Sequence, residues 1–353
     1  MISFLGHFGS HYSYAAVAAQ VAGRVARQQS LGGLMNLDDE FLPAHQDLLR
    51  WVQPTTDRSR LLAITAPSPI FETIFSGYKN VGLFLCPNTD ELSEAHTEIL
   101  DQCRIGFAPS EYCAEAARAA SKTPVVVCPL GVPESYAKRQ YTRPQGKPFT
   151  FLHLTTDFFL PGRKGTKEVV EAWKYVRSIP DAQLIVHAPR SISTEIYYDL
   201  AEQETKDGLG YGRFKMVSPP PRGMTEDELA DLLCSVDVVV LPSRCEGFGM
   251  VILAALVLGV PLITTDVTGQ RDFLGDFNPL LCPTAGVGEL AGEGGLAPLI
   301  HVGNLAESMM GAYENYDEVL RAAAADKQTR MKWTWPSVLN RWEEELVKWE
   351  SAK

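Results

Sequence analysis

The sequence lacks the features that mark membrane and secreted proteins. It contains no run of about 18 apolar residues, so we expect no membrane-spanning helix. Its first ten residues carry no Lys or Arg, and the apolar start ends at Gly6 and His7, which is not typical of a signal peptide.

Cysteine pairs are also missing. There is no CxxC motif and no His/Cys pairing of the kind that binds zinc, and an odd number of cysteines argues against a disulfide framework. Single cysteines in apolar runs are typical of buried free thiols, so we expect a protein of the reducing cytoplasm. The seven cysteines are Cys86, Cys103, Cys113, Cys128, Cys234, Cys245 and Cys282.

The composition is that of an ordinary globular protein. Hydrophobic residues make up 45% of the 353 residues and charged residues 21%, which is enough apolar material for two medium domains. The net charge of −11 lies almost entirely in the second half, because residues 1–147 hold 13 Lys and Arg against 14 Asp and Glu. This balance excludes a general polyanion-binding protein.

Short β-branched runs alternate with amphipathic stretches, which indicates an α/β fold with parallel sheets. We expect strands at 2–5, 61–65, 81–85, 105–108, 124–128, 149–154, 183–187, 214–217, 238–241 and 261–265. We expect helices at 12–28, 90–103, 111–120, 165–176, 194–204, 225–235, 249–258, 304–326 and 335–349. The stretch 35–58 shows no clear pattern, and the polar stretch 136–147 is typical of a linker.

This order predicts two α/β domains with parallel sheets, joined by one linker and with a central cleft between them. Residues 1–147 form the first domain with its linker, 148–330 the second, and 331–353 a closing helix. Ligands of such sheets bind at the carboxyl ends of the strands.

The most informative segment runs from Leu241 to Asp266. A buried strand is followed by Glu246-Gly247-Phe248-Gly249, then by an apolar helix that ends at Gly259. Gly247 and Gly249 allow a close approach to a ligand, and the N-terminus of the helix that begins with Met250 suits phosphate or sugar oxygens. Glu246 can accept hydrogen bonds from vicinal hydroxyls.

A second informative segment places Arg163-Lys164-Gly165 at a helix start after the strand 149–154. Two adjacent cations at a helix N-terminus oppose the helix dipole and need an anion beside them. A diphosphate is such an anion, with Lys164 as a point charge and Arg163 as a bidentate donor.

Together these segments closely resemble the donor-binding signature of retaining glycosyltransferases with two Rossmann-type domains (GT-B), most closely glycosyltransferase family 4. The resemblance implies a metal-independent hexosyltransferase that takes a glucose-like hexose from a nucleoside diphosphate sugar, with UDP-sugar favoured, and that needs no permanently bound cofactor. The implied catalytic residues are Glu246, Lys164 and His7. The implied donor-binding residues are Arg163, Lys164, Glu246, Gly247, Phe248, Gly249 and Met250.

The front half carries weaker parts of the same resemblance. Gly6, His7, Gly9 and Ser10 match the family's glycine-rich loop, where His7 either hydrogen-bonds the acceptor or caps the turn. Asp90 lies at the position of an acceptor contact, although we favour capping of the following helix by Thr89 or Asp90. The segment that begins at Trp335 resembles the family's closing helix, which crosses back to the front domain.

One departure concerns the nucleotide. The family has a second Glu eight residues after the first, where it binds the ribose, but this chain has Ala254. We expect another group to hold the ribose, with Asp266 and Arg271 on a neighbouring loop.

Two questions stay open from the sequence, namely the acceptor and whether the chain is catalytic. The acceptor is a small molecule, a glycan or a lipid, although the helix 12–28 offers only Arg24 and Arg27 to a membrane. A hydroxymethylated DNA base is the main alternative acceptor, and a non-catalytic nucleotide-sugar binding module is the alternative of another class. Contact with DNA phosphates would involve scattered cations, of which the candidates are Arg50, Arg58, Arg60, Lys138, Arg139 and Arg143.

Overall fold

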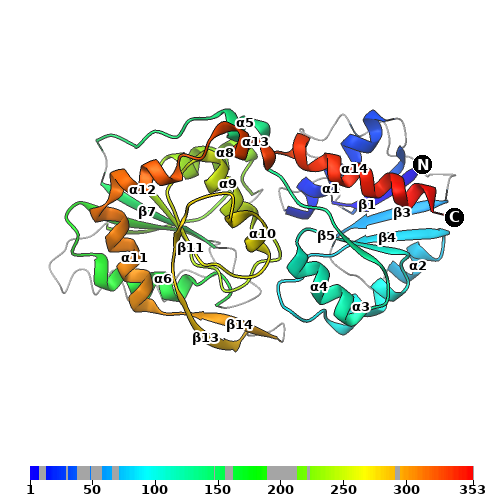
Figure 1. The fold of residues 1–353 in the computed structure, drawn as a ribbon, viewed down its shortest axis with the longest axis horizontal. Coiled ribbons are helices and arrows are strands. Elements are labelled where there is room, and N and C mark those ends of the chain that lie inside the picture. The colour runs from blue at the N-terminus through cyan, green and yellow to red at the C-terminus, as the bar shows by residue number, and fades with distance from the viewer. Residues whose placement is uncertain are drawn as a thin grey trace. The chain divides into compact units, whose positions relative to one another are not determined.

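The computed structural model has two compact units, each built around one parallel sheet (Figure 1). It describes residues 1–7, 13–28, 31–37, 48, 58–65, 71–146, 148–155, 162–188, 213–220, 223–290 and 295–352. Unit 1 comprises Met1–Gly131 and Trp333–Lys353, and unit 2 comprises Val132–Lys332. The expected α/β architecture with two parallel sheets is confirmed.

Unit 1 contains a six-stranded sheet in the order β2-β1-β3-β4-β5-β6, all parallel. Helices α1 and α14 cover one face, and α2, α3 and α4 cover the other (Figure 1). Its elements are β1 (Ile2–Gly6), α1 (Ser13–Arg27), β2 (Leu31–Asn36), β3 (Arg60–Ile64), α2 (Phe71–Phe75), β4 (Asn80–Phe84), α3 (Glu94–Asp101), β5 (Ile105–Ala108), α4 (Glu111–Ala120), β6 (Val125–Val127) and α14 (Trp335–Ser351).

The closing helix α14 belongs to unit 1, as the resemblance implied. It lies beside α1, so the two ends of the chain meet on one face of the sheet (Figure 1). Arg24 of α1 pairs with Glu343 of α14 at 2.6 Å. Trp342 is fully buried, stacks on Phe107 of β5 at 5.7 Å, and donates its ring N–H to the Pro129 carbonyl at 2.9 Å.

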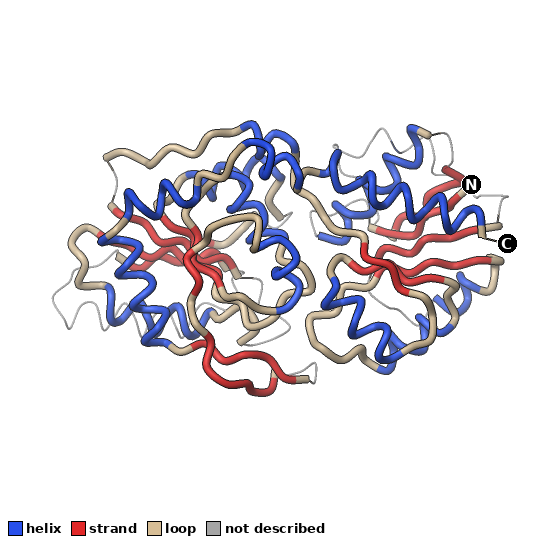
Figure 2. The backbone as a smooth tube through the Cα atoms, viewed as in Figure 1, coloured by secondary structure: helices blue, strands red, loops and turns tan. Residues whose placement is uncertain are grey.

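Unit 2 contains a second six-stranded parallel sheet, in the order β12-β11-β10-β7-β8-β9, and a separate antiparallel hairpin, β13–β14 (Figure 2). Its elements are α5 (Glu134–Lys138), β7 (Phe149–Leu154), α6 (Thr166–Val176), β8 (Ala182–His187), β9 (Phe214–Val217), α8 (Glu226–Cys234), β10 (Val238–Leu241), α9 (Met250–Leu258), β11 (Leu262–Thr264), the 3-10 helix Thr268–Gln270, α10 (Arg271–Leu274), β12 (Leu280–Leu281), β13 (Thr284–Glu289), β14 (Leu296–Ile300), α11 (Val302–Glu314), α12 (Tyr316–Ala323) and α13 (Lys327–Lys332).

Helix α9 is apolar on every side, and every residue from Ile252 to Leu258 is buried. A helix of this kind is stable only when neighbours surround it. It connects β10 to β11 and contacts α8 and α5, and its first turn lies at the carboxyl edge of the sheet. The core around β7 and β10 is filled by side chains of α6 and α11 on the other face.

Two local expectations differ from the structure. The stretch 136–147 is not a free linker, because Tyr136 and Tyr141 are buried and donate hydrogen bonds to the carbonyls of Glu226 and Val236 within unit 2. The two tyrosines therefore bind this polar segment to unit 2. The expected helix 194–204 lies outside the described residues.

The second difference is the start of the helix expected at 90–103. Helix α3 begins at Glu94, and its N-cap is Ser93, whose hydroxyl accepts from the His96 N–H. Neither Thr89 nor Asp90 caps it, because Thr89 donates instead to the Glu91 carbonyl at 2.7 Å. The serine later in the run competes successfully for the cap.

Candidate functional site

The candidate site is formed where three adjacent strands of unit 2 end. Strands β7, β10 and β11 are parallel neighbours, so their carboxyl ends lie at the same edge of the sheet. Arg163 and Lys164 follow β7, Glu246 follows β10, and Thr268 follows β11. Three segments that lie far apart in the sequence thus meet at this edge.

Glu246 is the centre of the cluster. Its Oε2 accepts from Arg163 Nη1 at 3.1 Å, and its Oε1 accepts from the Lys164 ammonium and from Ser243 Oγ, the latter at 2.7 Å. The side chains of Glu246, Arg163 and Lys164 are 8%, 11% and 17% exposed, so water screens these contacts only weakly.

The two cations keep Glu246 ionised. Burial by itself would raise the pKa of this carboxyl, but the charges of Lys164 and Arg163, with hydrogen bonds from Lys164 and Ser243, lower that pKa to about 2. Glu246 is therefore a carboxylate at neutral pH, able to accept hydrogen bonds and unable to act as a general acid there.

The backbone around Glu246 is also bonded on both sides. Its N–H donates to Thr268 Oγ1 at 2.8 Å, and its carbonyl accepts from the Gly269 N–H at 2.9 Å. The Arg244 N–H donates to the Arg163 carbonyl at 2.8 Å, and Arg163 Nη1 also donates to the Cys245 carbonyl. The turn that carries Glu246 is thus joined to the turn with the cations and to the loop after β11.

Two glycines make this close approach feasible. Gly165 has a φ of +68°, and a Cβ placed on it would lie 2.5 Å from the Pro242 carbonyl oxygen. Gly249 has a φ of +96° and immediately precedes α9. Side chains at these two positions would be strained or would clash, so the turns after β7 and β10 require glycine.

The expected donor segment Glu246–Met250 therefore lies as a unit at the start of α9. Phe248 does not face solvent: it is 2% exposed and packs on Phe273 with ring centroids 5.2 Å apart. Its side chain thus anchors the turn. Of this residue, only the backbone is available for the donor contact that the sequence predicted.

Four neighbours of the cluster were not expected from the sequence. Ser243 and Thr268 bond Glu246, and Gln270 is fully buried and donates to the Thr265 carbonyl. Arg244 reaches away from the cluster to four carbonyls of the hairpin, those of Gly288, Glu289, Ala297 and Pro298, at 2.9 to 3.3 Å. Each of the four lies in or beside a loop that the sequence analysis had singled out. The residue type alone, however, does not indicate which group it would contact.

His153 on β7 was also not expected to matter. It is fully buried, with Nδ1 2.7 Å from the Val240 carbonyl and Nε2 3.0 Å from Thr166 Oγ1, the first residue of α6. Because the carbonyl only accepts, Nδ1 carries the proton. Burial lowers its pKa to about 4, so this neutral ring joins β7, β10 and the start of α6 beneath the cations.

In unit 1, His7 lies directly after β1. Its Nε2 lies 3.1 Å from Thr65 Oγ1, directly after the neighbouring strand β3. Gly6 is the last residue of β1, whereas Gly9 and Ser10 lie outside the described residues. Asp90 is exposed in the loop after β4.

The other expected contacts are mostly engaged within the chain. Asp266 and Arg271 pair with each other at 3.2 Å and are more than half exposed. Ala254 is 2% exposed on α9. Several candidate DNA-contacting cations have acidic partners, namely Lys138 with Glu134, Arg139 with Asp231 and Arg143 with Asp237. Arg50 lies outside the described residues.

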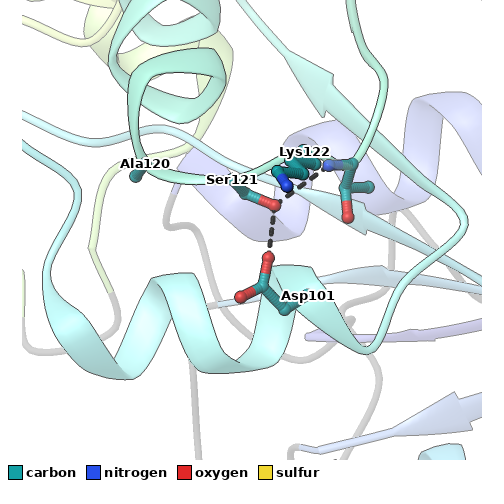
Figure 3. Close-up of a pocket in the computed structure, with 5 residues that line it drawn as sticks. Asp101, Ala120, Ser121 and Lys122 are labelled. Atoms are coloured by element: carbon teal, nitrogen blue, oxygen red, sulfur yellow. Dashed lines mark hydrogen bonds between the residues drawn. The ribbon is translucent and has the colours of Figure 1, made fainter.

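A separate cavity lies in unit 1, at the C-terminal ends of helices α3 and α4. It has a volume of about 510 Å³ and is lined by Asp101, Ala120, Ser121, Lys122 and Thr123 (Figure 3). Ser121 Oγ donates to Asp101 Oδ1 at 2.5 Å and accepts from the Thr123 N–H at 3.1 Å (Figure 3). These bonds tie the ends of α3 and α4 together, so we regard the cavity as a structural feature of two helix ends.

Within the described ranges, no group of three or more His, Cys, Asp or Glu residues is placed to hold a metal ion. In the same part of the chain, no helix is both long and apolar enough to cross a membrane.

Comparison with known proteins gives this cluster a context. Residues 155–293, which include all three charged residues, match the family described as glycosyl transferases group 1. A curated relative, O-antigen chain mannosyltransferase B of Escherichia coli, is 30% identical over 97 residues, which are 26% of this chain and 22% of the relative. The matched region thus spans about a fifth of that relative's length.

Solved structures show the same fold over nearly the whole chain. HepE of Anabaena, solved in complex with UDP and glucose, has a TM-score of 0.71 at 16% identity and covers 98% of this chain and 99% of its own. Sucrose-phosphate synthase of Thermosynechococcus elongatus has a TM-score of 0.67 at 14% identity, and the match covers 100% of this chain and 99% of that chain. The family match confirms the resemblance to glycosyltransferases over residues 155–293, and the solved structures confirm the GT-B fold that the resemblance implied.

Proposed function

We propose that this chain, whose residues 155–293 match the family described as glycosyl transferases group 1, transfers a hexose from a nucleoside diphosphate sugar to an acceptor hydroxyl with retention at the anomeric carbon. The observation that carries the proposal is the cluster of Glu246, Lys164 and Arg163 beside the N-terminus of α9. It brings two cations and one hydroxyl-binding carboxylate to the ligand-binding edge of the sheet.

In this proposal the diphosphate lies against Lys164 and Arg163. Cleavage of the sugar–phosphate bond leaves extra negative charge on the departing diphosphate, and fixed cations in a poorly hydrated site stabilise that charge. The N–H groups at the start of α9 add partial positive charge in the same region. We assign the charge stabilisation to these groups and not to a metal ion.

Glu246 and the backbone of Gly247, Phe248, Gly249 and Met250 would bind the sugar. A carboxylate accepts hydrogen bonds from two vicinal hydroxyls, and its low pKa keeps it in the accepting form. Since Phe248 points its ring at Phe273, the sugar contact from this residue is a backbone one.

On the acceptor side we propose His7, within the loop Gly6–Ser10, and Asp90. The bond between His7 Nε2 and Thr65 Oγ1 fixes the ring at the carboxyl end of β1, where an acceptor hydroxyl would approach. Asp90, in the loop after β4, is exposed and so open to an acceptor.

UDP-sugar with a glucose-like hexose is the donor we favour, because HepE was solved with UDP-glucose. We place the reaction in the cytoplasm, since all seven cysteines are free thiols.

A donor screen followed by a transfer assay tests the proposal. Nucleoside diphosphate sugars should raise the melting temperature, with a UDP-sugar giving the largest rise. A radiolabelled sugar should then move to an added glycan, lipid, DNA or small-molecule acceptor, and should be released slowly as free sugar without one. Stabilisation without any release or transfer would instead identify a non-catalytic binding module, and no stabilisation by any donor would contradict the proposal.

A further inference from the structure

The two cations proposed for the diphosphate already contact an anion of the chain itself. Lys164 Nζ and Arg163 Nη1 both donate to the carboxylate of Glu246, one to each oxygen. All three side chains are less than one-fifth exposed. A diphosphate that binds these cations therefore meets a negative charge only a few ångströms away, in surroundings where charges are weakly screened.

We infer that Glu246 is an internal competitor of the diphosphate: the incoming diphosphate takes Lys164 and Arg163 over from this carboxylate, and the carboxylate returns to them as the nucleoside diphosphate product leaves. This inference rests on the proposed function. It gives Glu246 a role in product release that is separate from sugar binding.

The surroundings of Glu246 allow the carboxylate to move while the turn stays in place. The backbone is bonded at its N–H by Thr268 Oγ1 and at its carbonyl by the Gly269 N–H, so the residue itself is anchored. Lys164 has a flexible four-carbon chain and can turn from carboxylate to phosphate. Once the cations face the diphosphate, the carboxylate is released to accept hydrogen bonds from the sugar hydroxyls.

A purely structural role of Glu246 predicts the opposite change in diphosphate affinity. If Glu246 only holds the two cations in a binding geometry, its loss misplaces them and diphosphate affinity falls. If Glu246 competes, its neutralisation leaves two undercompensated cations, and affinity for an anion rises. The sign of the change therefore separates the two roles.

Calorimetry on Glu246→Gln measures this sign. We expect inorganic pyrophosphate and UDP to bind about tenfold more tightly than to the wild type, and uridine, which has no phosphate, to bind equally well. Inhibition of transfer by UDP should become stronger by a similar factor. High salt should reduce the gain.

Glu345→Gln is the matched control. Glu345 of α14 is also a buried carboxylate paired with one Arg and one Lys, at 3.0 Å from Arg341 Nη2 and 2.8 Å from Lys348 Nζ, but it lies in unit 1 outside the donor motif. Its neutralisation should leave pyrophosphate and UDP affinity unchanged.

Glu246→Asp provides a second variant in case Glu246→Gln fails to fold. This variant keeps the charge but shortens the reach of the carboxylate to Lys164. UDP should therefore bind to it more tightly than to the wild type and, where Glu246→Gln also folds, less tightly than to Glu246→Gln. UDP affinity at or below the wild-type value in every folded variant overturns the inference while leaving the proposed function intact. Failure of the wild type and both variants to bind UDP or pyrophosphate overturns both.

Discussion

Lys164 is the residue whose proposed role depends most directly on charge. Replacement by Met keeps the length of the side chain and removes the ammonium, so affinity for a nucleoside diphosphate should fall by about 10- to 100-fold, the value of a lost charge-assisted hydrogen bond. Affinity for the nucleoside should hardly change. Lys174→Met is the control for calorimetry, because Lys174 lies within the helix α6 that follows Lys164 and pairs with Glu171 at the surface, with Nζ 2.8 Å from Oε1. Equal losses for both ligands would make Lys164 a structural residue.

Glu246 should affect the chemical step as well as the affinity for the diphosphate. Glu246→Gln keeps the size and loses charge-assisted hydrogen bonds to the sugar, worth roughly 1.5–3 kcal/mol, so kcat at saturating donor should fall by about one to two decades. Glu345→Gln is again the reference. A wild-type kcat would remove the carboxylate from the sugar site and leave it only its contact with the cations.

Ala254 shows where burial decides a question that the sequence left open. The sequence shows only that Ala254 stands where the family has its second Glu, whereas in the structure the residue is 2% exposed on a helix whose neighbouring residues are all buried. Ala254→Glu should therefore lower the free energy of unfolding by at least about 2 kcal/mol, because an unpaired carboxylate enters an apolar core. Urea unfolding measures the loss, and Ala254→Gln separates the charge from the added volume. Tighter UDP binding without a stability loss would show instead that a ribose contact had been restored.

At the scale of elements, the sequence predicts most of the strands because their apolar runs are long and regular. It misses β2 (Leu31–Asn36), in which Gly32 and Gly33 interrupt the β-branched pattern. It also misses the hairpin, because β13 is exposed along most of its length and so shows no apolar alternation. Patterns report burial, so elements without a buried face escape them.

One side chain joins the hairpin to the turn after β10 by several hydrogen bonds. Arg244 is 7% exposed and donates to four of its carbonyls. Arg244→Ala should loosen the hairpin locally, and hydrogen exchange at β13 and β14 should become about 10- to 100-fold faster, while exchange in β7 and β10 changes little. Arg244→Lys should give an intermediate effect because it keeps the charge but lacks the fork of donors. Unchanged exchange in the alanine variant would assign the hairpin's position to its apolar contacts.

At the scale of the whole molecule, the motifs predict which charged residues gather at the candidate site but not how they pair. Glu246 and Lys164 are recognisable because acids and cations next to glycines at helix starts have few structural reasons to be there. Their mutual contact depends on β7 and β10 being neighbours, a consequence of strand order that no local pattern contains. The boundary near 131, in place of 147, likewise depends on two buried tyrosines whose partners lie about a hundred residues later.

The two-unit division predicts that damage to the closing helix reaches only one unit. Trp342 of α14 is fully buried among side chains of unit 1, with Phe107 and Phe84 at 5.7 and 5.9 Å. Trp342→Ala should remove about 3–5 kcal/mol from the stability of that unit by opening a large cavity and leaving the Pro129 carbonyl without its donor.

Unit 2 has its own sheet and core, and the cluster of Glu246, Lys164 and Arg163 lies within it. If this cluster binds the donor as proposed, UDP binding should persist in Trp342→Ala at urea concentrations that have already unfolded unit 1. Fluorescence and far-UV circular dichroism follow the unfolding of unit 1, and calorimetry follows UDP binding. Trp342→Phe, which keeps an aromatic ring against Phe107, should shift the first transition much less. A single transition in which UDP binding and the fold of unit 1 are lost together would show that the two units are one cooperative body, and that α14 stabilises the proposed donor site as well as the sheet on which it packs.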